Sequence, residues 1–210
     1  RHPGIEIELD SDSRNLDLSK READVAVRAL PLDGTPPQHL LGRKIAPIVM
    51  ASYVAVAHAD RLDPERKGHQ PRWLGSDRRK ITAMLIAASS YPELPAWGAF
   101  ASMALTVQAA REGLGLVMLP TYVGDPDPTL QRLAQPDLRH MADLWLLSHP
   151  DLRDNARLVA ARECVTEALT IRAALFEGGG SAQEWREDAP VGPEDAPRTD
   201  PRSTLGLVSG

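Results

Sequence analysis

The segment Ala109–Pro120 constrains the fold of this 210-residue chain more than any other stretch. It predicts the last turn of a helix, a glycine stop at Gly113 and Gly115, a short buried strand and a proline end. Glycine is favoured just after a helix because it adopts a left-handed backbone without a Cβ clash. The apolar run Leu114–Leu119 is typical of a parallel strand that is covered on both faces. The segment therefore predicts a doubly wound α/β protein, a class that binds ligands at loop ends.

The bulk properties of the chain exclude several classes of protein. Its length allows a full core in one or two domains. Its net charge is −5, from 24 basic and 29 acidic residues, so the whole chain is no electrostatic match for DNA. No apolar run approaches the ~20 residues of a membrane span, and no signal peptide is visible. The chain opens without an initiator Met, which we interpret as a fragment whose start lies upstream. The single cysteine, Cys164, lies in an expected helix and is interpreted as a buried, inert thiol.

Strands and helices alternate along the chain. Period-two and apolar patterns predict strands at 4–9, 23–30, 45–57, 73–76 and 143–148. Helical patterns are expected at 16–22, weakly at 79–89, at 99–111 with Ser102 as N-cap, and most clearly at 155–176. Loops are expected at 61–72, around Tyr91 to Pro95, and at 122–128. The strands fall into two groups, which favours two lobes with a cleft between them.

The expected lobes are joined by two crossings, near Pro47 and near Trp145. Lobe one would comprise residues 1–47 and 146–177, and lobe two residues 48–145. From Gly178 onward, glycines, prolines and acidic residues dominate. Such a composition buries too little apolar surface to offset the entropy of ordering, so we expect residues 178–210 to be a disordered tail.

Four segments in order, 1–9, 18–28, 109–120 and 144–153, resemble the effector-binding domain of LysR-type transcriptional regulators. The resemblance covers roughly residues 1 to 177. It implies an α/β fold of two lobes like a type 2 periplasmic binding protein, and a small-molecule effector held between the lobes. It also implies a cytoplasmic homodimer or homotetramer without a cofactor. We expect this chain to lack the family's helix-turn-helix, and also the first strand and helix of lobe one. We therefore expect a lobe one that is truncated at its N-terminus, and DNA binding only through a domain that this chain lacks.

Candidate effector contacts follow from the family's pocket, which is built from strand ends and helix N-termini between the lobes. Free N–H groups and the helix dipole at such ends suit carboxylate ligands. Arg28 ends an expected strand, where its guanidinium can clamp an anion; a surface salt bridge is the alternative. The seven candidates from these positions are Arg28, Ser102, Gly75, Ser76, Asp77, Ser11 and Ser13. Plain helix capping by Ser102 and a simple turn at 75–77 remain open. Trp145 is interpreted as core packing.

Catalysis and metal binding receive no support from motifs. The six histidines are scattered without metal-ligand spacing, and no nucleophile elbow or phosphate-binding loop is present. Gly113 and Gly115 follow a helix and precede a strand, which is the wrong order for a dinucleotide-binding turn. We therefore expect no enzyme and no bound metal.

Three other functions stay open at this point. The first is the solute-binding protein of a transport system, which the missing signal peptide disfavours. The second is an enzyme on a similar two-lobed scaffold, which requires a perturbed acid or base in the cleft. The third is a regulator without a ligand that acts only as a dimerisation unit. The lost strand and helix of lobe one would expose an apolar seam, so we also expect the fragment to be less stable than an intact domain, or to aggregate.

Overall fold

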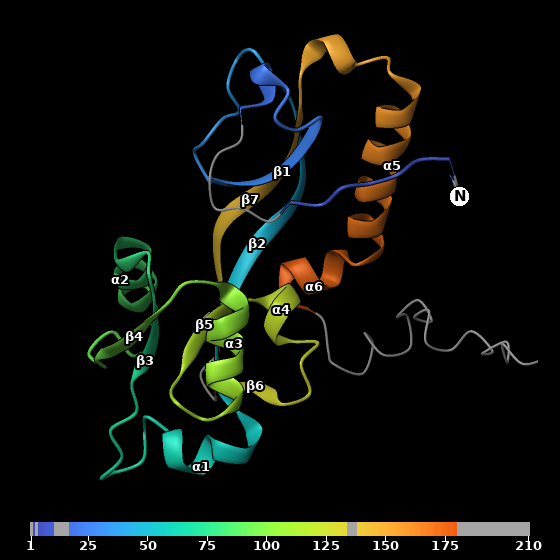
Figure 1. Cartoon of the computed structure of the whole chain (residues 1–210). Helices are drawn as coiled ribbons and strands as arrows, with labels where there is room; N and C mark the ends of the chain where they lie inside the picture. Colours follow the sequence, from blue (N-terminus) through green and yellow to red (C-terminus); the bar gives the residue numbers. More distant parts are fainter. Residues whose placement is uncertain (1, 3, 11–16, 134–137, 180–210) are drawn as a thin grey trace, which may run out of the picture.

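The computed structural model describes residues 2, 4–10, 17–133 and 138–179. Two antiparallel strands, β2 (Leu41–Ala55) and β7 (Arg139–Ser148), run between an upper and a lower half of the molecule (Figure 1). β2 passes the expected crossing at Pro47 as one continuous strand, with irregular pairing between Lys44 and Ala46 and between Ile48 and Val49. Such irregularities bend a strand and increase its twist. They lie where the two strands leave one half and enter the other.

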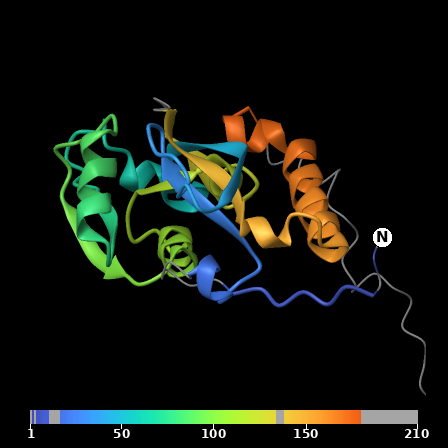
Figure 2. The ribbon, with the colours of Figure 1, turned by 90° about the horizontal axis from the view of Figure 1, so that it is seen from above.

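The upper half is a three-stranded antiparallel sheet in the order β1 (Val25–Pro31), β7, β2. It is followed by the 3-10 helix η3 (Pro150–Leu152), α5 (Ala156–Ile171) and α6 (Ala173–Glu177). The 3-10 helix η1 (Leu18–Lys20) precedes β1. Seen from above, α5 lies on one side of the strands and α2 on the other (Figure 2).

The lower half combines the end of β2 with shorter elements. β2 pairs there with β5 (Val117–Pro120) and β6 (Leu130–Arg132), both antiparallel. β3 (Trp73–Ser76) is parallel to β4 (Ala96–Phe100) and is joined to the β5 segment by a parallel bridge from Trp73 to Leu116. The helices of this half are η2 (Val56–His58), α1 (Ala59–Leu62), α2 (Arg79–Ala87), α3 (Met103–Arg111) and α4 (Thr121–Gly124). None of the helices in the described part of the chain is both long and apolar enough to cross a membrane.

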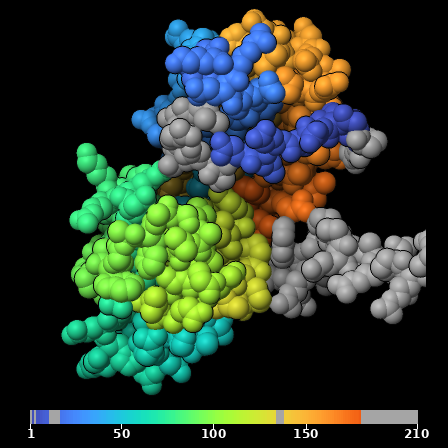
Figure 3. All heavy atoms as spheres, viewed as in Figure 1, coloured from blue at the N-terminus to red at the C-terminus, as the bar shows by residue number. Residues whose placement is uncertain are grey.

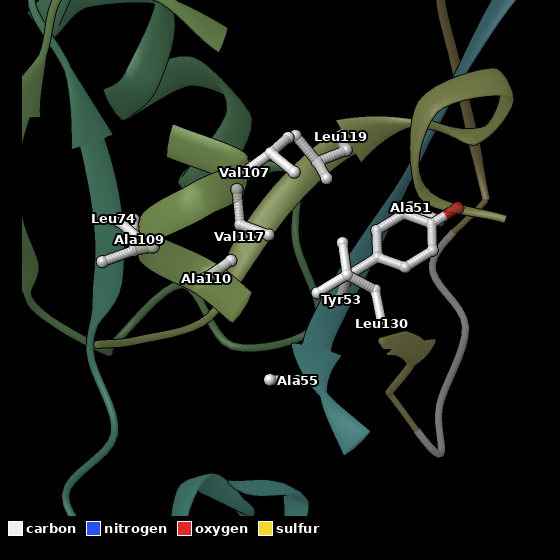
Figure 4. Close-up of a cluster of buried hydrophobic side chains, with 10 residues drawn as sticks. All are labelled: Ala51, Tyr53, Ala55, Leu74, Val107, Ala109, Ala110, Val117, Leu119 and Leu130. Carbon is white, nitrogen blue, oxygen red and sulfur yellow. The ribbon is translucent and has the colours of Figure 1, made fainter. Parts of the chain in front are cut away.

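Two buried clusters cover the two faces of this lower sheet. On one face, side chains of α3 meet those of β2 and β5, including Val107, Ala110, Tyr53 and Val117 (Figure 4). On the other, Trp73 is 1% exposed and packs with Leu116 and four other apolar residues. The segment 109–120 behaves as expected in its helix end, its glycine turn and its burial, but β5 pairs antiparallel with β2 and, among the described residues, has only a single parallel bridge, from Leu116 to Trp73. α3 ends at Arg111, Gly113 has a φ of +68°, and β5 follows.

Several sequence expectations are wrong, for identifiable reasons. Residues 4–9 form no strand, because a strand needs a neighbour and this segment runs past the upper half rather than along β1 (Figure 1). The helix expected at 155–176 breaks at Arg172 into α5 and α6. Cys164 is exposed on α5 rather than buried.

The region before α3 also departs from expectation. Residues 99 and 100 belong to β4, a strand that the sequence did not reveal because its residues are almost all exposed. Thr121–Gly124 is a single helical turn rather than a loop. The expected disordered tail at 178–210 begins too early, because Gly178 caps α6 and accepts a hydrogen bond from Arg132. Residues 180–210 of that tail lie outside the described residues.

Candidate functional site

The antiparallel register of the upper sheet aligns three side chains that carry N–H donors. Arg28 of β1 is opposite Trp145 of β7, and Trp145 is opposite Lys44 of β2. Directly opposed residues in an antiparallel pair project to the same face of the sheet. We call this side the crossover face. It also carries Asp143, which is opposite Leu30 and Pro47.

Asp143 organises the charges of the crossover face. The Asp143 side chain is 5% exposed, and its carboxylate contacts Lys44 Nζ at 2.5 Å and His140 Nε2 at 2.8 Å. Burial by itself would raise the pKa of Asp143, but hydrogen bonds from Lys44 and His140 outweigh it and hold this pKa below its ordinary value. The carboxylate is therefore ionised at neutral pH, and it fixes the positions of Lys44 and His140 beside Trp145.

Trp145 contributes a hydrogen-bond donor that has no acceptor. Its ring is half-buried, and Nε1 is one of two buried side-chain polar atoms without a partner in the described part of the chain. Unsatisfied buried donors are uncommon in folded proteins and call for an explanation. The expectation that Trp145 serves only core packing leaves this donor unexplained.

The lower half presents its strand ends toward the crossover. β3, β4 and β5 run in one direction, opposite to β2. Pro120, at the end of β5, pairs with Met50 of β2, which on its other side pairs with Arg139 at the start of β7. The carboxyl ends of these strands and the N-terminus of α3 therefore lie at the edge that faces the upper half (Figure 1). Because side chains alternate between the two faces along β2, Ala51 and Tyr53 lie on the same side as the crossover face. Both belong to the buried cluster under α3.

Four of the seven predicted contacts gather at this edge. Ser76 is in register with Phe100, and the Asp77 N–H donates to the Phe100 carbonyl at 3.1 Å. Ser102 is the N-cap of α3, as expected, and accepts from the Leu105 N–H at 3.3 Å. Gly75 has a structural role, since a Cβ there would lie 2.7 Å from the Gly98 carbonyl oxygen of β4.

The remaining predicted residues are divided. Arg28 lies on the crossover face and is half-buried. Ser11 and Ser13 lie outside the described residues. Lys44, Asp143 and His140 were missed by sequence reasoning. The sequence did contain a signal for Lys44, because a cation that borders a strand pattern close to the expected crossing indicates a functional position.

The surface is hollowed between the two halves, and atoms of β2 are visible at the bottom of this hollow (Figure 3). Two cavities among the described residues lie elsewhere, one between α5 and the opposite face of the sheet and one beside the α3–β5 turn. No group of three or more His, Cys, Asp or Glu side chains suited to a metal occurs in the described ranges.

Residues 1–170 match the family described as the LysR substrate binding domain. This chain belongs to that family. Its fold is shared with the effector domain of the transcriptional regulator AmpR of Pseudomonas aeruginosa, at a TM-score of 0.62 and 18% identity, over 82% of this chain and 84% of that one. The AmpR effector-binding domain from Citrobacter freundii has a TM-score of 0.61 and 14% identity, over 80% of this chain and 86% of that one. No match was found among curated proteins.

A third solved structure has the same fold. The regulatory domain of CrgA, a LysR-type regulator from Neisseria meningitidis, gives a TM-score of 0.58 and 17% identity, over 72% of this chain and 78% of that one. The two-lobed periplasmic-binding-protein-like fold is therefore confirmed. As a LysR substrate-binding domain, this chain has a regulatory, effector-sensing role. Nothing in these comparisons supports the alternative of a transport protein.

The Asp143 cluster predicts an acid-sensitive contribution to stability. Because the pKa of Asp143 is lowered in the folded chain, its stabilising effect is complete above the unfolded value of about 3.9 and is lost as the pH falls below it. The pKa values of Asp127 and Asp17 are also lowered, so their contributions to stability are lost over the same range of pH. We expect the stability advantage of the wild-type chain over Asp143→Asn to shrink between about pH 4 and pH 2. Urea titrations at a series of pH values measure this difference; an advantage independent of pH would contradict the assignment.

Proposed function

We propose that the crossover face and the facing edge of the lower half bind a small anionic or polar metabolite. The observation that carries this proposal is the row of Arg28, Trp145 and Lys44 across three neighbouring strands. Arg28 and Lys44 contribute two positive charges to this row, and Trp145 contributes an indole N–H that has no acceptor among the described residues. Arg is suited to hold a carboxylate through two parallel hydrogen bonds.

The lower half supports the same choice of ligand. α3 directs its N-terminus at the edge that faces the crossover, and the N-terminus of a nine-residue helix favours negative charge. Ser76 and Ser102 add hydroxyl groups at this edge and Asp77 adds a carboxylate; the Ser76 hydroxyl also pairs with Thr82 Oγ1 at 2.9 Å. A ligand that contacts both halves would favour one arrangement of them over another, which is the physical basis of a regulatory response.

We assign residues 1–47 and 146–177 to lobe one, and 48–145 to lobe two, with β2 and β7 as the two crossings. We propose a sensing module without catalytic activity, in a cytoplasmic regulator that contacts DNA through a separate helix-turn-helix. The family match supports these assignments.

We also propose that the chain forms a homodimer, or a homotetramer, through the lower half. α2 has no buried residue, and Ile81 and Met84 on it are 42% and 52% exposed. Trp97 of β4 and Leu105 of α3 add exposed apolar surface on neighbouring elements. Surfaces of this kind mark contacts with other proteins.

A metabolite screen by thermal shift tests the effector site. We expect at least one small carboxylate to raise the melting temperature saturably, by several degrees at 100 times its Kd. Arg28→Gln should weaken that ligand about tenfold, as for the loss of one charge-assisted contact. Arg157→Gln, an exposed position on α5, is the matched control and should bind as the wild type does. No active compound in the screen, or equal losses in both variants, would count against the site.

A further inference from the structure

α5 packs loosely on the upper sheet. None of its 16 residues is buried, although the sequence gives it an apolar stripe that includes Leu158, Val165 and Leu169. Only Leu169 joins one of the buried clusters, as a partly buried member beside α6. The inner face of α5 therefore does not close on the strands below it.

The space that remains under α5 is a cavity of about 290 Å³. Its floor is the face of the sheet opposite to the crossover face, which we call the outer face. Leu41 and Arg43 of β2 lie there, opposite Ser148 and Leu146 of β7. Its roof is α5, through Val159, Arg162, Glu163 and Thr166. Small-molecule sites begin at about this volume.

The polar groups of this cavity are placed for an anion. Arg162 is held by the carbonyl oxygens of Leu152 and Arg153, at 3.3 and 2.6 Å, and donates to Ser148 Oγ at 3.5 Å. Three donations leave other N–H groups of its guanidinium available. Ser148 is 2% exposed, and in the described part of the chain its hydroxyl oxygen only accepts, so the hydroxyl proton is available to a ligand.

Arg43 provides a second cation at the same cavity. No ion pair joins it to Glu163 among the described residues, although both line the space. The apolar side chains Leu41, Leu146 and Val159 form the rest of the lining. The lining combines two guanidinium groups, one carboxylate and the Ser148 hydroxyl with an aliphatic surface. Its cations outnumber its single carboxylate, which suits a molecule with an anionic head and an apolar body.

We propose that the cavity between α5 and the outer face is a second ligand site, which takes a small aliphatic carboxylic acid in its ionised form. The carboxylate contacts Arg43, Arg162 and the Ser148 hydroxyl, and the hydrocarbon part lies on Leu41, Leu146 and Val159. This site is on the opposite side of the sheet from the proposed effector site, and it does not depend on that proposal. A ligand here would tighten α5 on the two crossover strands.

Titration of the 210-residue chain with 4-methylpentanoate tests the site, with amide chemical shifts as the readout. We expect saturable shifts at Ser148 and Val159, with a Kd on the order of 1 mM for a ligand of this size. The neutral 4-methylpentanamide should bind at least tenfold more weakly. Arg43→Gln should weaken the acid about tenfold, and Val159→Phe should reduce binding by filling the space.

Two matched controls separate this site from others. Arg157→Gln removes a cation from α5 outside the cavity, and Arg28→Gln removes one from the crossover face; both should leave the Kd unchanged. Equal weakening by Arg43→Gln and Arg157→Gln would overturn the proposal, as would no saturable shift up to about 20 times the expected Kd. Loss of binding in Arg28→Gln alone would place the acid on the crossover face and would also overturn it. Folding of each variant is checked by its urea midpoint.

Discussion

Trp73→Ala should destabilise the chain by about 3–5 kcal/mol, the range for deleting a large buried aromatic side chain. Trp73 is 1% exposed and lies in a cluster with Val54, Leu116 and Leu133. Its Nε1 also donates to the Tyr91 carbonyl oxygen at 3.0 Å, so its removal leaves that oxygen without this donor. A typical domain is stable by only 5–15 kcal/mol, so this one change removes a large part of the total.

Trp97→Ala is the matched control for this prediction. Trp97 lies on the neighbouring strand β4 and is 39% exposed, with the Arg72 guanidinium 3.9 Å from its ring centroid. We expect a loss of about 1 kcal/mol or less, from the exposed cation–π contact and partial burial. Urea unfolding followed by far-ultraviolet circular dichroism measures both variants, because tryptophan fluorescence would change with the substitutions themselves. Similar losses for the two variants would show that the cluster around Trp73 is not the core of the lower half.

Arg132→Met should cost about 3–5 kcal/mol, because it leaves a buried carboxylate without its cation. Arg132 Nε and Nη2 donate to Asp125 at 2.8 and 2.5 Å, and Nη2 also donates to the Gly178 carbonyl at 2.8 Å. The Asp125 side chain is 5% exposed and accepts from the Tyr53 hydroxyl at 2.7 Å. Burial, and then this carboxylate, raise the pKa of Tyr53, so the hydroxyl stays a donor.

This network also connects the two halves of the molecule. Gly178 follows α6, which comes from the upper half, whereas Arg132 ends β6 in the lower half. We therefore expect Arg132→Met to increase amide exchange at the end of α6 as well as to lower the urea midpoint. The double variant Asp125→Asn with Arg132→Met should recover part of the loss, since no buried charge then remains.

Arg66→Met controls for the general effect of this substitution. Arg66 is 58% exposed and lies 3.9 Å from an Asp60 carboxylate that is fully exposed. An exposed pair of this kind contributes at most about 1 kcal/mol. A loss in Arg132→Met no larger than that of Arg66→Met, with no recovery in the double variant, would show that the buried network does not hold the halves together.

The local pattern around Ala109 to Pro120 was sufficient to predict α3, its glycine stop and β5, because caps and turns depend on residues close in the sequence. The Ser102 cap and strand β3 were predicted for the same reason. The family and the two-lobed class were also accessible, since the order of several weak segments carries that information. Residues 4–9 show the limit of such patterns: alternation gives a strand propensity, but a strand forms only beside a neighbour.

The sequence by itself determined the α/β class and the turn chemistry, whereas Arg28, expected to end a strand, lies in the middle of β1. Only the tertiary structure decided that Arg28, Trp145 and Lys44 form one row, that Asp143 is held between Lys44 and His140, and that α5 leaves a cavity above Leu146 and Ser148. The physical reason is register. Which residues of distant strands face each other depends on irregularities in β2 and β7 and on how closely a helix packs, and those are settled by the whole chain together.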